Sequence, residues 1–539
     1  MLISLHTMLL SIPSFIFSSF FIYSFLTIIL ILLILNFIHS ITNNKLPPGP
    51  FHLPLIGNFI QLNLCYPYRS FIYWKQKFGP IYTVWLPQPC LVIAGYKQIS
   101  ELLVNSKYAD IFSDRPTFSY SFGVFNNFQP DGDGIILSRQ KVWKKNRNFA
   151  LSAFRNLGMG RQIMETRINY HKDILISRLK EIVNNKNGIV NDMSMQFDFY
   201  SGNIIQSLLI GRFHEYNDPE FIHIKKLMDN TTEEVATIQM LIVNRWPLFR
   251  WIFPAYWRYI RQGFELQRFF LNEVDIHIAK INKDGKVNVA ELEDPECFVE
   301  AYLQSIIAEK QSLEDPAIRL TIAICSADLW AGGIETVAST LTWAIIYLLN
   351  YPDIQLKLQE EFDKQLGDQP FRYSDHLELP YFRAFIDELQ RIVNILPWNI
   401  PHSTSKEVSL GEWIIPKDTI VMVQHGSVHL DPLNFPQPEV FRPERFLNLE
   451  GKYKGSDLLK PYGSGKRICL GDSLAKMELF IMLASLLRNF NFELLDGKLP
   501  SLNRTFGMLN HASPFKLLFY FLMLLFVLFY NLKKKNYIK

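Results

Sequence analysis

One cysteine stands in a sequence context that favours metal binding. Cys469 lies in the glycine-rich loop YGSGKRICLG, residues 462–471, directly before a helical pattern that runs through Arg488. Amide donors and the positive dipole end of a helix N-terminus favour a thiolate, and a thiolate is a metal ligand. Glycines at 463, 465 and 471 let the backbone lie flat against a large planar cofactor, and Arg467 offers a cation for an acidic group on it.

The other cysteines carry no comparable signal. Cys65, Cys90, Cys297 and Cys325 are scattered, and no CxxC pair occurs among the five cysteines of the chain. Free cysteines are commonly small buried hydrophobic residues, and we interpret these four in that way. The pattern indicates neither a disulfide framework nor a closed zinc site, and it is typical of a cytosolic catalytic part.

Two further pairs of residues have helical spacing. Trp143 and Arg147 are one turn apart, so their donor groups project together. Glu388 and Arg391 stand at i,i+3 and share one helix face, a spacing that is also typical of a surface ion pair worth under about 1 kcal/mol.

A long helix is predicted from the cap residue Asp315, followed by Pro316, to Asn350. At 1.5 Å per residue it extends roughly 50 Å, which is comparable with the width of a large domain, so it should cross the core. Gly332 and Gly333 lie in its middle, where each glycine destabilises a helix by about 1 kcal/mol relative to alanine. They indicate either a notch beside a ligand or close packing against another helix, and the pattern does not choose between these.

Composition narrows the class of protein. The 539 residues are 48% hydrophobic and carry a net charge of +4, which excludes a disordered chain and gives no basis for a nucleic-acid partner. Strand patterns at 81–86 and 90–93 precede many helical stretches without an internal repeat. We therefore expect a mainly α fold with a smaller β-rich part in one large domain. No GxGxxG motif follows a strand, so NADPH is not expected to bind this chain.

The N-terminal segment is predicted to be a transmembrane helix. No Lys, Arg, Asp or Glu precedes Lys45, and residues 15–38 are rich in Phe, Ile and Leu, enough for the roughly 20 apolar residues of a membrane span. A cleaved signal peptide is the alternative, although the apolar run is long and no basic segment precedes it. Since the positive charge follows the anchor, everything after it is expected on the cytoplasmic side.

The resulting division has four parts. Residues 1–44 form the hydrophobic membrane anchor, 45–57 a proline-rich spacer, 58–521 the catalytic domain and 522–539 a hydrophobic and basic tail. The first residues of the apolar run that starts at Leu517 are expected to form the final strand. The remainder is short for a membrane span, so interfacial contact is expected of it.

The loop around Cys469 resembles the haem-binding signature of the cytochrome P450 family, Phe-x-x-Gly-x-Arg-x-Cys-x-Gly. Tyr462 replaces the usual Phe and keeps an aromatic ring. The resemblance implies haem b with Cys469 as the thiolate ligand of its iron, and Arg467, Tyr462 and Gly465 as cofactor-binding residues. It extends from Pro47 to about Phe521 and points to the animal microsomal branch.

The same resemblance assigns roles to the other patterns. Trp143 and Arg147 resemble a pair that contacts a haem propionate, and Arg115 and His402 resemble two further propionate donors. Arg445 is implied to join Glu388 and Arg391 in a structural network. Glu335 and Thr336, which follow Gly332-Gly333 where the family usually has Ala-Gly, are the implied catalytic residues: the acid as a proton source and the hydroxyl as a hydrogen-bond donor. The alternative for Thr336 is an ordinary helix residue whose hydroxyl bonds back to a carbonyl one turn earlier.

The implied activity is insertion of one oxygen atom from O2 into an apolar organic substrate such as a lipid, steroid or xenobiotic. The implied partners are NADPH-cytochrome P450 reductase, which would carry the flavins and use the NADPH, and cytochrome b5 as a further electron donor. Lys466, Arg139, Lys141, Lys144 and Lys145 are expected to supply the basic docking surface. The implied location is the endoplasmic reticulum membrane, with the catalytic domain on the cytosolic face.

Two rival functions stay open at this point. A haem-thiolate isomerase or lyase acting on an oxygenated lipid would need no reductase and would be expected to lack the acid and alcohol at 335 and 336. A non-catalytic haem-binding sensor would keep Cys469 without consuming NADPH.

Overall fold

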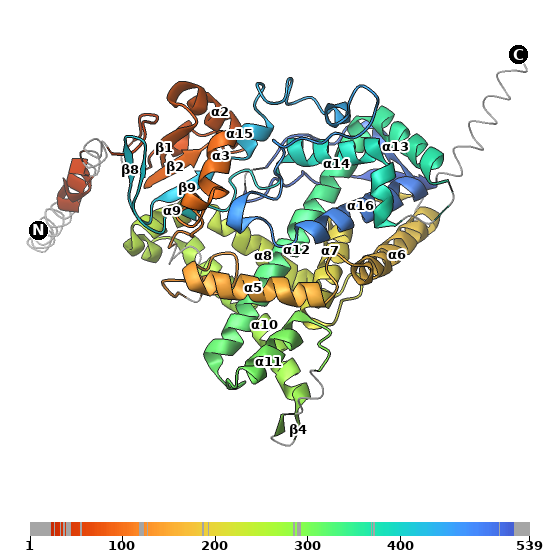
Figure 1. Cartoon of the computed structure of the whole chain (residues 1–539), viewed down its shortest axis with the longest axis horizontal. Coiled ribbons are helices and arrows are strands. Elements are labelled where there is room, and N and C mark those ends of the chain that lie inside the picture. Colours follow the sequence, from red (N-terminus) through yellow and green to blue (C-terminus); the bar gives the residue numbers. More distant parts are fainter. Residues whose placement is uncertain are drawn as a thin grey trace, which may run out of the picture.

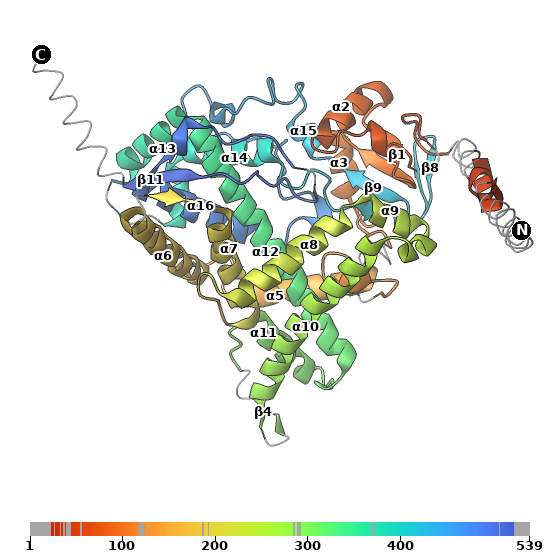
Figure 2. The same ribbon diagram turned by 180° about the vertical axis from the view of Figure 1, so that it is seen from behind.

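The long helix α12 (Pro316–Asn350) organises the molecule. Asp315 caps it by accepting a hydrogen bond from the amide of Ala317, and Pro316 occupies the first turn, as the sequence predicts. Nearly all its residues from Ile322 onward are buried, since α7, α10 and α16 pack around it. Figures 1 and 2 show α12 passing through the middle of the molecule in both views.

The computed structural model describes residues 23–25, 27–32, 34, 35, 38, 45–53, 56–117, 123–126, 128–185, 188–191, 193–283, 286, 287, 293–367, 369, 372–505 and 507–521. The other α-helices are α2 (Pro67–Phe78), α3 (Tyr96–Leu103), α4 (Ser106–Ala109), α5 (Gln140–Asn156), α6 (Gln162–Asn185), α7 (Met193–Ile210), α8 (Pro219–Val235), α9 (Ile238–Arg245), α10 (Pro254–Ile281), α11 (Phe298–Ala308), α13 (Pro352–Gln365), α14 (Pro380–Val393), α15 (Gly426–His429) and α16 (Asp472–Asn489). Short 3-10 helices include η3 (Pro247–Trp251), η6 (Pro443–Phe446) and η7 (Gly465–Arg467).

Within the described part of the chain, the strands form four small sheets. The largest has the order β1-β2-β9-β6 and lies at the end of the molecule near the N-terminus (Figure 1). Its members are β1 (Ile81–Trp85), β2 (Pro89–Ile93), β9 (Ile420–Val423) and β6 (His402–Ser403), and the pairing of β2 with β9 is parallel. The other sheets pair β10 (Phe490–Leu494) with β11 (Leu517–Phe521) and β3 (Ile189–Val190), β4 (Asn282–Lys283) with β5 (Lys286–Val287), and β7 (Val408–Leu410) with β8 (Trp413–Ile415).

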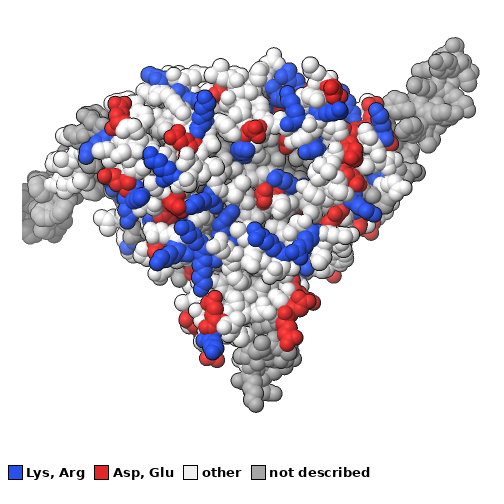
Figure 3. All heavy atoms as spheres, in the orientation of Figure 1, with Lys and Arg blue, Asp and Glu red and all other residues white. Residues whose placement is uncertain are grey.

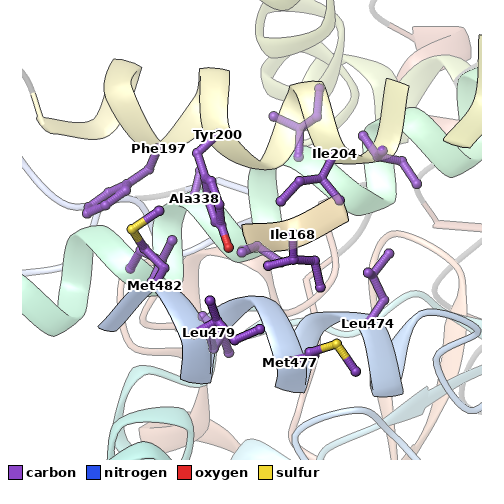
Figure 4. Packing of buried hydrophobic residues seen from close by; sticks show 14 of the residues in the cluster. Ile168, Phe197, Tyr200, Ile204, Ala338, Leu474, Met477, Leu479 and Met482 are labelled. Atoms are coloured by element: carbon purple, nitrogen blue, oxygen red, sulfur yellow. The ribbon is translucent and has the colours of Figure 1, made fainter. Parts of the chain in front are cut away.

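One continuous core joins distant parts of the chain. A single cluster of buried hydrophobic residues extends from Tyr68 to Phe519, which agrees with one large domain. Figure 4 shows Phe197, Tyr200 and Ile204 of α7 facing α16, with Ile168 of α6 between the two helices. The mainly helical fold with a smaller β-rich part is confirmed, and β11 is the final strand as predicted.

The predicted proline-rich spacer is docked on the sheets rather than free. The amide of Thr83 in β1 donates to the Pro48 carbonyl at 3.1 Å, and the amide of Ile414 in β8 donates to the Lys45 carbonyl at 2.9 Å. A Cβ on Gly49 would collide with the Thr83 carbonyl, so glycine is needed for this approach. The docking fixes where the chain enters the domain.

The predicted anchor lies largely outside the described residues. Its described part includes a helix at Tyr23–Leu32, whose apolar side chains are exposed, and Figure 1 shows it apart from the main body. Among the described residues, the helix long and apolar enough to cross a membrane is Pro316–Asn350, which is the core helix α12. The tail at 522–539 also lies outside the described residues.

Candidate active site

Cys469 lies at the entrance to α16, in the turn that follows η7. Its amide donates to the Tyr462 carbonyl at 2.9 Å, which closes the loop. The residue is exposed to solvent, although surrounding atoms partly desolvate its thiol. Burial raises the pKa of Cys469, and the Gly471 amide and the charge of Arg147 oppose that rise only in part. The helix N-terminus alone therefore does not produce the thiolate that the sequence pattern favours.

The loop glycines meet different surroundings. A Cβ at Gly463 or Gly471 would meet no atom within 4 Å, whereas one at Gly465 would collide with the Leu103 carbonyl of α3. Gly463 and Gly465 have φ of 82° and 76°, where a side chain is strained. The glycine at 465 is thus required by packing against α3, a reason that the sequence does not reveal.

The Tyr462 hydroxyl is engaged away from the thiol. It accepts a hydrogen bond of 2.7 Å from the side-chain amide of Gln390 on α14. The departure from the family's usual Phe therefore ties the loop to α14 and adds no free hydroxyl at Cys469.

Four basic residues predicted to bind the cofactor gather beside this loop. Arg115 donates to the carbonyls of Ile400 and Pro401 at 2.9 Å, and Arg147 donates to the Ile468 carbonyl at 2.6 Å. His402 donates from Nδ1 to the Phe112 carbonyl at 2.7 Å. Arg467 donates to the carbonyls of Ser113, Ile135 and Ser138 at 2.8, 3.2 and 2.6 Å.

The charge of this cluster is poorly balanced. Burial and the charge of Arg147 lower the pKa of Arg115 to about 9. Burial, together with Arg115, Arg147 and Arg139, lowers the pKa of Arg467 to about 7, and Asp114 compensates only in part. Burial and the charge of Arg115 lower the pKa of His402 well below its usual value. Buried cations that repel one another are the pattern expected where an anionic ligand binds.

Trp143 completes the cluster. The guanidinium carbon of Arg467 lies 4.0 Å from the centre of its ring, a cation–π distance. The indole Nε1 is buried and has no hydrogen-bond acceptor within the described residues. An indole N–H can only donate, so an acceptor is expected to lie there.

A buried acid of α12 holds the loop that carries several of these carbonyls. Asp328 accepts hydrogen bonds from the amides of Ile135 and Ile136 at 2.6 and 2.9 Å. Burial raises the pKa of Asp328 to about 7, and the two amides oppose the rise. The long helix thereby positions the acceptors of Arg115 and Arg467.

The two glycines of α12 serve different purposes. A Cβ on Gly333 would lie 2.7 Å from Ile205 Cγ1 of α7, so this glycine allows close helix packing. A Cβ on Gly332 would meet nothing within 4 Å, and this glycine is exposed in the middle of a mostly buried helix. The Thr336 hydroxyl, one turn later, donates to the Gly332 carbonyl at 2.8 Å. Close helix packing is therefore confirmed for Gly333, whereas the space beside Gly332 is open and its use as a notch for a ligand stays a prediction.

Glu335 is turned toward α8 and the strand-entry loop before β11. Its Oε1 lies 3.1 Å from Nε2 of His511, and Lys225 of α8 adds a positive charge. Burial favours the neutral acid, but His511 and Lys225 outweigh it and lower the pKa of Glu335. His511 has its pKa raised in return, because the bond to Glu335 outweighs burial. Sequence reasoning missed His511 and Lys225, since nothing in the sequence links them to residue 335.

Glu388, Arg391 and Arg445 form a closed network. Arg391 donates to both oxygens of Glu388 at 2.7 and 2.8 Å, and Arg445 Nε donates to Glu388 Oε1 at 3.1 Å. Further donors of Arg391 reach the carbonyls of His429 and Pro438. The Glu388 and Arg391 side chains have no exposed surface, so this is not a surface ion pair.

The expected basic docking surface needs one correction. Arg139 is buried and bridges Asp114 at 3.1 Å and Asp418 at 2.5 Å, so it offers no charge to a partner. Lys144 and Lys466 are exposed and share Asp110 at 3.6 and 2.5 Å. Figure 3 shows Lys and Arg side chains gathered over α5 on the face seen in Figure 1.

Comparison with known proteins identifies the family. The family model "Cytochrome P450" matches residues 47–519. The chain is 33% identical to a 3-ketosteroid oxygenase of Caenorhabditis elegans over 92% of this chain and 83% of that protein. It is 32% identical to cytochrome P450 2E1 of Sus scrofa over 88% of this chain and 92% of that protein. It is 30% identical to cytochrome P450 2C23 of Rattus norvegicus over 88% of this chain and 93% of that protein.

The chain belongs to the cytochrome P450 family. It is a haem-thiolate monooxygenase, an oxidoreductase that uses O2, and a reductase is the typical source of electrons for its microsomal relatives. These relatives also indicate association with the endoplasmic reticulum membrane. The residues described above fit a haem, since they combine an accessible thiol, unbalanced cations and an unsatisfied indole donor.

Proposed function

We propose that the Cys469 thiolate holds the haem iron and that Arg115, Arg147, Arg467, His402 and Trp143 hold the haem carboxylates. The cluster of mutually repelling buried arginines beside an accessible thiol supports this proposal most directly. When bound, the haem supplies O2 activation, which a thiolate ligand promotes by pushing electron density onto iron. The positive charge of the metal ion also offsets the rise in the Cys469 pKa.

Replacement of the ligand tests the assignment. Cys469→Ala is expected to abolish the red-shifted Soret band of the ferrous carbon monoxide complex. The matched control is Cys325→Ala, because Cys325 is buried in α12 and its pKa is raised by burial. A Cys469→Ala protein that keeps the band, or a Cys325→Ala protein that loses it, contradicts the proposal.

Thr336 and Glu335 are proposed to govern proton delivery. The support is that the side of Gly332 is open and that the Thr336 hydroxyl, which donates to the Gly332 carbonyl, lies next to that opening. Glu335 is a carboxylate at rest; it accepts a proton from His511, whose side chain is 38% exposed and so reaches solvent, and returns to the carboxylate when it passes that proton toward the reaction site. General acid catalysis of this kind contributes about 10²–10⁴-fold.

The measurement for this proposal is the coupling of NADPH use to product. Thr336→Ala is expected to keep its haem content and NADPH oxidation, while product per NADPH falls and hydrogen peroxide rises. His511→Gln is expected to act in the same direction, with a loss that is largest below the raised pKa of His511 and shrinks above it, where the wild-type imidazole has also lost its proton. Thr340→Ala is the matched control, since its hydroxyl also bonds to a carbonyl one turn earlier. Equal coupling in all three variants contradicts the relay.

Electrons are proposed to come from NADPH-cytochrome P450 reductase, with cytochrome b5 as a second donor. The exposed lysines of α5 and Lys466 supply the positive surface. Lys144→Glu is expected to raise the reductase concentration needed for half-maximal turnover, with a dependence on salt. Lys141→Glu, on the same helix, maps the extent of the surface, and Lys172→Glu on α6 serves as the control.

The four-part division and the cytosolic orientation complete the proposal. Leu248, Trp251, Ile252 and Trp257 expose large apolar surfaces, and the neighbouring helix α9 lies at the end of the molecule where the N-terminal helix leaves. We propose that this segment rests on the membrane surface beside the anchor at 1–44. Asn503 is an exposed sequon residue, so an endoglycosidase-sensitive mass shift there contradicts a cytosolic domain.

The substrate is proposed to be an apolar molecule of the steroid or lipid class. The support is the worm relative whose name is 3-ketosteroid oxygenase. Turnover of a panel of 3-ketosteroids, fatty acids and small xenobiotics by the full chain with reductase tests it. Oxidation of xenobiotics alone contradicts the steroid and lipid assignment.

A further inference from the structure

A second group of potential metal ligands lies on helices that supply no residue to the proposed haem pocket. His277 stands near the end of α10, Cys297 caps α11, and Glu300 is in the first turn of α11. One ligand atom from each lies within 4.8 Å of the other two. His277 and Cys297 are fully buried and Glu300 is half-buried, so the group is part of the interior.

The hydrogen bonds of His277 fix which ring nitrogen faces this group. Nε2 lies 3.1 Å from the Ile210 carbonyl at the end of α7, and a carbonyl can only accept, so Nε2 carries a proton. Nδ1 lies 3.2 Å from Glu300 Oε1 and makes no well-aligned hydrogen bond with any described residue. Two acceptor atoms at that distance, one buried and one half-buried, repel each other unless a positive charge lies between them. That charge is either a second proton on the imidazole or a metal ion.

The arrangement has the outer support that metal ligands usually have. Donation from the far ring nitrogen to a carbonyl is the usual way to orient a metal-binding histidine. Glu300 Oε2 accepts a hydrogen bond of 2.9 Å from the Glu296 amide, which leaves Oε1 directed at His277. The amides of Glu300 and Val299 point at the Cys297 sulfur and stabilise its anion, although burial still raises its pKa to about 12.

We propose that His277, Cys297 and Glu300 form a zinc site that joins the end of α10 to the start of α11. Nitrogen, sulfur and oxygen ligands together suit Zn²⁺, and water would complete a tetrahedron. The thiolate and the carboxylate balance both charges of the ion, so no net charge is buried. Metal–ligand distances of about 2.0–2.3 Å put tetrahedral ligand atoms roughly 3.3–3.8 Å apart, so the three atoms, which lie within 4.8 Å of one another, would need only a small adjustment around the ion.

Binding releases the proton of the Cys297 thiol. Arg167 and Lys280 are the nearby cations; they stabilise the thiolate but repel the incoming ion, so the site should favour a soft divalent ion over Mg²⁺ or Ca²⁺.

The test uses the full-length holoprotein, stripped with a chelator and then dialysed against micromolar ZnCl2. Metal analysis should find about one zinc ion per haem in the wild-type protein. Cys297→Ser and Glu300→Gln, which keep the shape of each side chain, should each lower zinc affinity at least about tenfold, the usual minimum for loss of a ligand or its support. Cys65→Ser is the control, because Cys65 is half-buried elsewhere on the surface of the fold.

A thermal scan adds a second readout. Zinc should raise the unfolding midpoint of the wild-type protein and of Cys65→Ser, but not of Cys297→Ser. The proposal is overturned if no zinc is retained, or if the variants retain as much as the wild type. If a lower pH stabilises the zinc-free protein and zinc does not bind, the pair is an imidazolium–carboxylate ion pair and the zinc site is wrong.

Discussion

The molecule holds two clusters of buried arginines that differ in how their charge is balanced. In the Glu388 network, Arg391 and Arg445 share a buried carboxylate, and the remaining donors of Arg391 reach carbonyls. Beside Cys469, the hydrogen bonds of Arg115 and Arg467 within the described residues go to backbone carbonyls and not to a carboxylate, and each arginine lowers the pKa of a basic neighbour. Both clusters remove arginine side chains from solvent. What distinguishes the structural cluster from the proposed ligand-binding cluster is whether protein carboxylates balance the positive charge.

The difference lets function be inferred from a balance of charges. A cluster whose charges are paired by protein atoms contributes to the stability of the fold only while all its members are present. A cluster with unbalanced charge is instead stabilised when a ligand of opposite charge binds. Four substitutions test the comparison.

The largest effect is expected from Arg391→Met, which leaves the buried Glu388 with much of its charge unpaired. A loss of about 3–5 kcal/mol in the free energy of unfolding is expected, a large share of the total stability. Denaturant titration of the purified protein measures it. Arg69→Ala is the control, since its ion pair with Glu439 is exposed and should be worth under about 1 kcal/mol. Equal losses in both variants would remove the distinction.

Asp328 is a buried acid that has amide donors but no cation, so its effect should depend on pH. Its pKa in the folded protein, about 7, is above the ordinary value of 3.8, so the folded state binds the proton more tightly. Its contribution is therefore fully present below about pH 4 and is lost as the pH rises through about 7. Asp328→Asn should remove this dependence and be more stable than the wild type by about 2–4 kcal/mol above neutrality. Denaturant midpoints across the pH range measure the difference, and parallel curves would contradict it.

Arg147→Met is expected to weaken haem retention while changing the stability of the fold little. Loss of one charge-assisted hydrogen bond costs about 1.5–3 kcal/mol, or roughly 10–100-fold in affinity. The rate of haem transfer to an excess of a haem-free globin measures it, and Arg147→Lys should recover part of the loss. If the rate of haem transfer were unchanged while the free energy of unfolding fell strongly, Arg147 would have a structural role like that of the Glu388 network.

Tyr462→Phe is expected to have the smallest effect. It removes the hydrogen bond from Gln390, worth about 0.5–1.5 kcal/mol, and leaves the ring in place. The Soret spectrum of the variant should match the wild type, while the unfolding midpoint falls slightly. A shifted spectrum would show that the hydroxyl acts on the cofactor.

Much of the fold and of the candidate site could be predicted because short sequence patterns determine these parts of the structure. The cap and proline at 315 and 316, the strands near 81 and 90, and the loop before α16 each depend on neighbours in sequence. The partners of those residues were not predictable. His511 meets Glu335, and Arg139 meets Asp418, only because the fold joins segments far apart in the chain.

Cysteines show the same limit. Cys297 has no sequence neighbour that suggests a ligand set, since His277 is on another helix, and its interpretation as a small core residue was the reasonable one. The reasons for glycine at 333 and 465 are likewise tertiary contacts, with Ile205 and the Leu103 carbonyl. Motifs of neighbouring residues can be recognised in the sequence, whereas the charged residues that the fold brings beside them cannot.

The parallel pairing of β2 with β9 has a consequence for biosynthesis. Ile93 and its partner Val423 leave the ribosome far apart in time, roughly tens of seconds at a synthesis rate of about 5–20 residues per second. During that interval the edge of the β1–β2 hairpin has no partner strand, and an open edge invites pairing with other chains. The edge of β2 in the nascent domain is therefore exposed for a long time, and we expect chaperones to prevent its aggregation until β9 has been synthesised.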